Sequence, residues 1–241
     1  DVNGKTLWVH NSSTPVLTYQ TINSKRGQDG MEDNGVLPSF NGIGVHDCWG
    51  SYWKYPDITH AICGAHILRE LTWVEEFSPE HEWATRFKSL LLDMKKAKER
   101  TMDRGKTEIS QYYAQKFDAE YDSIIKEAET SCPDPPDSPD RKRGRKKKGK
   151  ERSLIERLKA LKESTCLFLH NFLVPFDNNQ AERDVRNVKT KTKVSGCFRT
   201  EDGAQDYLNI MSYLSTGIKR GVSVFEALTA AFAGNATIAL Q

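Results

Sequence analysis

The segment PDPPDSPDRKRGRKKKGK, residues 133–150, constrains the fold of this chain more than any other feature. Prolines and acids fill its first half and basic residues fill its second half, so neither a long helix nor a buried strand can pass through it. We predict an exposed linker that extends to about residue 152. A solvated run of charge is the simplest interpretation, and a flexible arm on DNA is the alternative. The folded core must therefore come from the sequence on either side.

The sequence on both sides alternates between strand and helix patterns. We predict strands at residues 5–13, 16–22, 42–47 and about 60–63, followed by a helix over about 65–77. Apolar residues at helical spacing, Tyr113 among them, predict two antiparallel helices between residues 79 and 130, and one further helix over about 153–172. We therefore expect an α/β protein in which a helical insertion, residues 79–172, interrupts a sheet domain formed by residues 1–78 and 173–241.

The C-terminal region carries two helix signals. Residues 201–219 place apolar side chains on one face, and Gly221 supplies a stop. Ser223 and Glu226 have the spacing of a capping box, which predicts that a short helix begins there.

Charge and cysteine usage restrict the class of protein. The formal net charge is only +2, but cations concentrate in residues 141–152 and 183–199, so a polyanion would meet local patches. Five widely spaced cysteines without a C-x-x-C pair fit a reducing compartment. No apolar run approaches the roughly 18 residues of a membrane span. We expect a cytoplasmic protein with no membrane partner.

Residues 175–199, PFDNNQAERDVRNVKTKTKVSGCFR, place Glu182 at the head of a basic helix. One interpretation is structural, because Asn179 and Glu182 have the spacing of a capping box. The other is chemical: Glu182 binds a metal ion while cations bind a phosphate backbone. Those cations are Arg183, Arg186, Lys189, Lys191, Lys193 and Arg199. Spacing alone leaves both interpretations open.

Asp47 is the second carboxylate of interest, because it ends the predicted strand GIGVHD. Mg²⁺ prefers carboxylate oxygens, and a phosphodiester-cleaving site needs several of them together. A long helical insertion would allow Asp47 and Glu182 to converge despite their separation in sequence.

Four stretches together resemble the transposases of the insertion sequence 66 family: VNGKTLWVHNSSTP, GVHDCWGSYWKY, HAICGAHILREL and residues 175–221 with the phrase D-N-N-x-A-E-R. The resemblance implies a DDE transposase with a ribonuclease-H-like mixed sheet and flanking helices. It matches Asp47 to the second catalytic aspartate and Glu182 to the catalytic glutamate. Asn178 and Asn179 belong to the same phrase and are expected to support the site. Cys63 and His66 match a C-x-x-H element, for which we favour a structural or supporting role over zinc binding.

The resemblance also implies a reaction and its partners. Two Mg²⁺ ions, or Mn²⁺ instead, would bind the carboxylates while water and then a freed 3′-hydroxyl attack phosphodiesters. Transposon ends and target DNA would be the partners of a homo-oligomer, in a bacterial cytoplasm and on its nucleoid. The first catalytic aspartate is expected on a strand before Val2, and Asp1 does not match it. We therefore expect this segment to lack the first strand and to be inactive in isolation.

Three alternatives remain open. A nuclease of the same fold would share the carboxylates without joining DNA ends. A non-catalytic DNA-binding remnant of a decayed element would keep the cations without the reaction. A helical scaffold protein would require the D-N-N-x-A-E-R phrase to serve helix capping alone.

Overall fold

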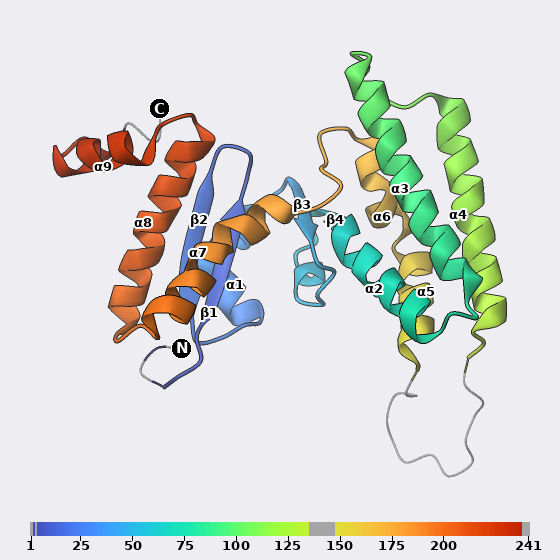
Figure 1. Ribbon diagram of the computed structural model, residues 1–241, viewed down its shortest axis with the longest axis horizontal. Coiled ribbons are helices and arrows are strands. Elements are labelled where there is room, and N and C mark those ends of the chain that lie inside the picture. Colours follow the sequence, from blue (N-terminus) through green and yellow to red (C-terminus); the bar gives the residue numbers. More distant parts are fainter. Residues whose placement is uncertain (1, 3, 135–147, 238–241) are drawn as a thin grey trace, which may run out of the picture. The chain divides into compact units, whose positions relative to one another are not determined.

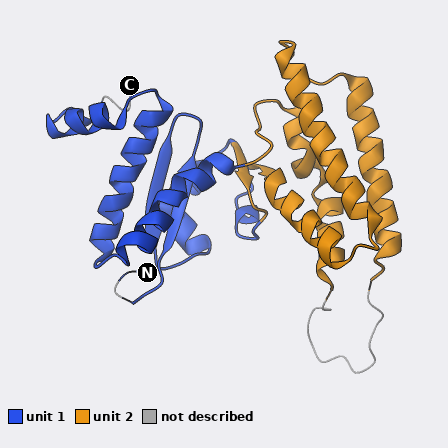
Figure 2. Cartoon of the chain, viewed as in Figure 1, with its two compact units in different colours: residues 1–42, 49–58, 178–241 blue, residues 43–48, 59–177 orange. Residues whose placement is uncertain are grey.

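The computed structural model describes residues 2, 4–134 and 148–237. The chain divides into two compact units, which are coloured separately in Figure 2. Unit 1 consists of Asp1–Gly42, Trp49–Ile58 and Asn178–Gln241, and unit 2 consists of Ile43–Cys48 and Thr59–Asp177. Most of the predicted linker, residues 135–147, lies outside the described residues, so its character stays a prediction.

The sheet of unit 1 is an antiparallel hairpin (Figure 1). β1 (Trp8–Ser13) pairs with β2 (Thr18–Asn23), from Trp8 opposite Asn23 to Ser13 opposite Thr18. α8 (Glu201–Lys219) runs along the outer edge of β2. Polar side chains of α8 cover that edge, because they accept hydrogen bonds from the backbone N–H groups of the strand. The pairs are Thr18 with Thr216, Gln20 with Ser212 and Ile22 with Gln205.

Other helices complete unit 1. α1 (Gln28–Asn34) and α7 (Asn179–Ser195) contact the hairpin, and α9 (Val224–Phe232) contacts α8. Two short 3₁₀ turns, η1 (Leu37–Ser39) and η2 (Tyr52–Lys54), belong to the same unit. One core cluster joins α7, α8 and the start of the chain through five buried side chains, Val2, Val188, Phe198, Ala204 and Leu208. A second cluster contains Met31, Tyr55 and Ile58.

Unit 2 joins a short parallel sheet to a group of helices. β3 (Ile43–His46) pairs with β4 (Thr59–Ile62) in parallel, and α2 (Gly64–Phe77) follows β4. α3 (Glu82–Asp103) packs on α2 and on α4 (Gln111–Ser131). The phenolic hydroxyl of Tyr121 in α4 donates to the carbonyl of Leu158 in α5 (Lys150–Ala160), and α6 (Lys162–His170) contacts β4.

The predicted helical faces are confirmed in most positions. Trp83, Phe87 and Met94 of α3 are buried, as are Phe117 and Tyr121 of α4. Tyr113 was predicted on the same face, but it is exposed. The predicted single helix over 153–172 is wrong, because the chain breaks at Leu161 (φ −115°, ψ 29°) into α5 and α6. Apolar spacing continued across the break and therefore concealed it.

The α/β class is confirmed, whereas the ribonuclease-H-like arrangement stays a prediction. In the part of the chain that the structure describes, the strands form two separate two-stranded sheets. The predicted boundaries at residues 78 and 172 also stay a prediction; the compact units group β3, β4 and α2 with the long helices. No helix among the described residues is long and apolar enough to cross a membrane.

Candidate active site

Asp47 lies directly after β3, at the carboxyl end of the parallel pair β3–β4. Side chains alternate along a strand, so the residue before it faces the opposite way. His46 is accordingly buried and Asp47 is exposed. The fold of unit 2 therefore presents the predicted carboxylate to solvent from a strand end.

The turn at Asp47 is fixed by its neighbours on both sides. Cys48 has a left-handed backbone (φ 69°), and its backbone N–H donates to His46 Nδ1 at 3.1 Å. A backbone N–H can only donate, so Nδ1 of His46 must be unprotonated and Nε2 carries the hydrogen. His46 Nε2 then donates to His60 Nδ1 at 3.0 Å, which joins the turn to β4.

The charge state of His46 agrees with this hydrogen-bond pattern. Burial, together with the neighbouring His60, lowers the pKa of His46 to about 4, although Asp47 opposes the shift. His46 is therefore neutral at pH 7, and its Nδ1 remains an acceptor for the Cys48 amide. Asp47 therefore follows a neutral, buried His46 that is hydrogen-bonded to His60.

Cys63 and His66 lie at the junction of β4 and α2. Cys63 is completely buried, and its backbone N–H donates to the His46 carbonyl at 2.9 Å. The His66 N–H donates to the Cys63 carbonyl at 3.1 Å, in the first turn of α2. The next residue, Gly64, leaves no room for a Cβ beside the ring of Phe176. These contacts describe a close-packed junction, and the supporting role of Cys63 and His66 stays a prediction.

Glu182 lies in the first turn of α7, but the capping-box interpretation is wrong. The residue at the N-cap is Asn178, and its side chain makes no capping hydrogen bond to α7. Asn179 is already the first helical residue, so the third helical position is Ala181 and Glu182 lies one residue too late. Ala181 is instead connected to β1, because Asn11 Nδ2 donates to its carbonyl at 3.1 Å.

The two sides of α7 differ sharply. Asp184 and Val188 are the buried residues of this helix, every residue of which is described. Glu182, Arg186 and Lys189 follow at i, i+4 and i+7, on the side away from Asp184. Arg183, Arg186, Lys189, Lys193 and Arg199 are all exposed. The predicted carboxylate therefore shares one face of α7 with cations.

Lys191 differs from the other predicted DNA contacts. Its ammonium donates to the carbonyls of Gly196 and Cys197 at 3.2 and 3.3 Å, and it lies 3.9 Å from the ring centroid of Phe198. These contacts close the C-terminal end of α7 onto the following loop. A contact between Lys191 and DNA would have to compete with them.

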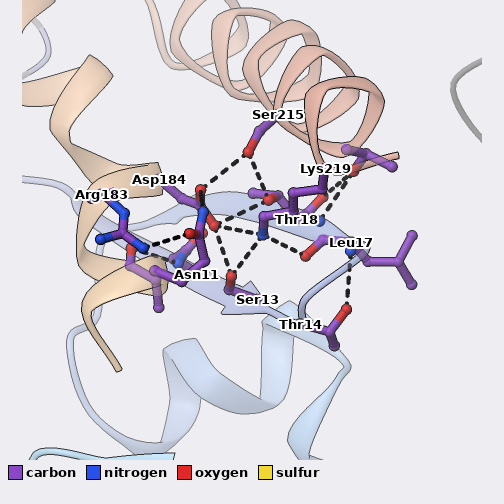
Figure 3. A network of polar contacts seen from close by, with 12 residues as sticks. Asn11, Ser13, Thr14, Leu17, Thr18, Arg183, Asp184, Ser215 and Lys219 are labelled. Carbon is purple, nitrogen blue, oxygen red and sulfur yellow. Dashed lines mark hydrogen bonds and ion pairs between the residues drawn. The ribbon is translucent and has the colours of Figure 1, made fainter. Parts of the chain in front are cut away.

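A buried polar network surrounds Asp184 (Figure 3). One carboxylate oxygen accepts from Ser13 Oγ (2.7 Å), Thr18 Oγ1 (3.1 Å) and Lys219 Nζ (2.8 Å). The other accepts from Gln180 Nε2 (3.0 Å) and Ser215 Oγ (3.1 Å). Burial alone would raise the pKa of Asp184, but Lys219 and Ser13 outweigh burial and hold that pKa below its usual value.

The sequence prediction missed Asp184 and Lys219. One signal was present: Asp184 occupies the position four residues before Val188, so an acid lies on the apolar side of a helix. No pattern in the sequence pointed to Ser13, Thr18 or Ser215 as its partners. Asp47 belongs to unit 2 and Glu182 to unit 1, so their convergence stays a prediction.

Comparison with protein-family models gives a match over residues 1–206, to the model described as "Transposase IS66 family". A search of curated proteins and a search of solved structures each returned no match. The matched range includes β1 to α7 and the first residues of α8, and therefore both predicted carboxylates.

Proposed function

This chain belongs to the transposase IS66 family, whose function is DNA transposition, and we propose that it acts by Mg²⁺-dependent cleavage and strand transfer at Asp47 and Glu182. The observation that supports the proposal best is the outer face of α7. Glu182 lies there with Arg186 and Lys189, while Asp184 and Val188 face the protein. A carboxylate beside exposed cations suits a metal ion beside a bound phosphate.

The donor atoms fit the proposed ion. Asp47 and Glu182 offer carboxylate oxygens, the ligand type that Mg²⁺ prefers. Within the described residues, no group of three or more His, Cys, Asp or Glu side chains is arranged to hold a metal. The resemblance implies one further aspartate, and we propose that these three carboxylates hold the ions together. Bound Mg²⁺ would activate the attacking oxygen and stabilise charge on the leaving oxygen.

The chain's own residues have separate tasks in this proposal. His46 and the Cys48 amide fix the backbone that presents Asp47. Arg186 and Lys189 hold a DNA phosphate beside Glu182, which positions the strand without reading its sequence. We also propose transposon ends and target DNA as partners, bound by a homo-oligomer.

Glu182→Gln tests the proposal most simply, in a chain that carries all three carboxylates. Loss of a ligand should slow Mg²⁺-dependent cleavage at least about a hundredfold, since a metal contributes several kcal/mol to the transition state. DNA affinity should stay constant or rise, because one negative charge near the phosphates is removed. Glu201→Gln is the matched control, since Glu201 is an exposed acid in the first turn of α8. Unchanged cleavage by Glu182→Gln would remove Glu182 from the site.

The products of the same reaction separate a transposase from a nuclease. A transposase keeps the freed 3′-end and joins it to target DNA, whereas a nuclease releases it. Labelled element ends should therefore appear in joined products. Cleavage without joining would favour the nuclease, and DNA binding without cleavage would favour a non-catalytic remnant.

A further inference from the structure

The two buried side chains of α7 contact the rest of unit 1 in different ways. Val188 contributes to an apolar cluster with Phe198 and Leu208, toward the C-terminal half of the helix. Asp184 is the other buried residue of α7, and it is the one nearer to Glu182. The orientation of the N-terminal half of α7, where the predicted catalytic carboxylate lies, therefore depends on a polar anchor.

The partners of Asp184 come from several elements. Ser13 belongs to β1, Thr18 to β2, and Ser215 and Lys219 to α8. The pair with Lys219 is strongly shielded, with side-chain exposures of 4% for Asp184 and 7% for Lys219. Two contacts to the backbone of α7 reinforce it, from Gln20 Nε2 to the Asp184 carbonyl and from Asn11 Nδ2 to the Ala181 carbonyl, both 3.1 Å long.

Hydrogen bonds restrict rotation in a way that an apolar contact does not, because they weaken steeply when their angles change. Glu182 and Asp184 are two residues apart, or about 200° around the helix axis, so holding Asp184 inward directs Glu182 outward. A rotation of about 20° would move a side-chain tip that lies roughly 5 Å from the axis by about 2 Å. A displacement of about 1 Å is enough to slow a reaction about a hundredfold.

We propose that Asp184 is a positioning residue: with Lys219, Ser13, Thr18 and Ser215 it fixes the rotation of α7 and so presents Glu182 and the adjacent cations on the outer face. The inference rests on the proposed function of Glu182. The competing explanation is that the network only stabilises unit 1. The two explanations make different predictions for a variant that lacks the charged pair but is as stable as the wild-type protein.

The experiment compares three variants of the full chain. Asp184→Asn removes the charge and leaves Lys219 buried without its charged partner, although its contacts to Ser13 and to the Leu17 carbonyl remain. Asp184→Asn combined with Lys219→Met removes both charges, an exchange that often leaves stability unchanged. Val188→Ala is the matched control, since Val188 is the other buried residue of α7 and is absent from the polar network. All are compared at temperatures that give equal folded fractions.

Two readouts are measured. Amide hydrogen exchange should accelerate at least about tenfold in residues 179–186 for Asp184→Asn and for the double variant, and Val188→Ala should leave those amides within about twofold. The Mg²⁺ concentration for half-maximal cleavage should rise at least about tenfold in the same two variants and should not change in Val188→Ala.

The outcomes separate the explanations. If the double variant recovers wild-type exchange, Mg²⁺ dependence and cleavage together with its stability, the network is only stabilising and the proposal is wrong. If the wild-type chain cleaves no DNA, the proposed function fails, but selective acceleration in residues 179–186 would still support the anchoring role of Asp184. Equal acceleration throughout unit 1 would reject that role whatever the cleavage result.

Discussion

Asp47 and Glu182 are presented by opposite means. Asp47 follows a strand, and the residue before it, His46, is buried, neutral and hydrogen-bonded to His60. Glu182 belongs to a helix, and the residue two positions later, Asp184, is buried in a charged pair with Lys219. In each case an accessible carboxylate has a buried polar neighbour on the opposite side of its element. That neighbour is one residue away next to the strand and two residues away in the helix, because side chains at those spacings point in opposite directions. We therefore expect the contacts that support Asp47 and those that support Glu182 to be disrupted under different conditions.

Breaking the charged anchor should have the largest effect. Lys219→Met leaves Asp184 buried beside an apolar chain, which should lower the free energy of unfolding of unit 1 by about 3–5 kcal/mol. Urea denaturation measures the change. Lys193→Met is the control, because Lys193 is exposed on the outer face of α7, and it should stay within about 0.5 kcal/mol. A loss below about 1 kcal/mol for Lys219→Met would show that the ion pair does not anchor the helix.

As pH falls, the contacts around Asp47 should be destabilised first. The pKa of His46 falls from 6.5 in the unfolded chain to about 4 in the folded one, so the unfolded state binds more protons between those values. Stability should decrease as pH falls from 6.5 toward 4, by at most about 3 kcal/mol. Protonation also places a hydrogen on Nδ1, where the Cys48 amide now donates.

The polar network around Asp184 should be destabilised only at a lower pH. Its folded pKa lies below the ordinary value of 3.8, so its stabilising contribution is complete above that pH and is lost only as pH falls further. Hydrogen exchange in metal-free buffer can follow β3 and β4 separately from α7. The protection factors of amides in β3 and β4, which correct for the intrinsic pH dependence of exchange, should fall between pH 6 and about 4, and His46→Gln should remove that fall. A fall in the protection factors of α7 over the same pH range would contradict the distinction.

A smaller effect is expected at Cys48. A left-handed backbone is unfavourable for every residue with a Cβ, and glycine removes the penalty. Cys48→Gly should therefore raise the stability of unit 2 by about 1 kcal/mol, whereas Cys48→Val should lower it. Thermal denaturation of both variants provides the measurement. Destabilisation by glycine would mean that the Cys48 side chain matters more than its backbone.

Much of the fold followed from local periodicity. The strands of the hairpin, the strand before Asp47 and the helix over residues 201–219 were predicted nearly to their observed ends. The capping box of Ser223 and Glu226 was also predicted correctly. α1 was not predicted, because QDGMEDN has too few apolar residues to show a helical period. The break at Leu161 was missed because the spacing of apolar residues does not reveal a local change in backbone angles.

The candidate site could be predicted only in part. Asp47 and Glu182 were predicted because they end or begin elements and match motifs of the family, and their role stays a prediction. Asp184 was not found, because its partners on β1, β2 and α8 are 31–171 positions away and belong to no motif. The same holds for the pair of His46 and His60, which depends on the parallel register of β3 and β4. Tertiary partners of single polar residues carry no periodic signal.

Asp47 and Glu182 are proposed to hold the same metal site, and iron-directed cleavage of the protein tests this directly. Fe²⁺ replaces Mg²⁺ in the full chain, and peroxide with ascorbate generates radicals that cut the backbone beside the bound ion. We expect cuts near both Asp47 and Glu182. Excess Mg²⁺ should suppress both, and either Asp47→Asn or Glu182→Gln should abolish both. A cut near only one carboxylate, or a cut near Glu182 that persists unchanged in Asp47→Asn, would contradict a shared site.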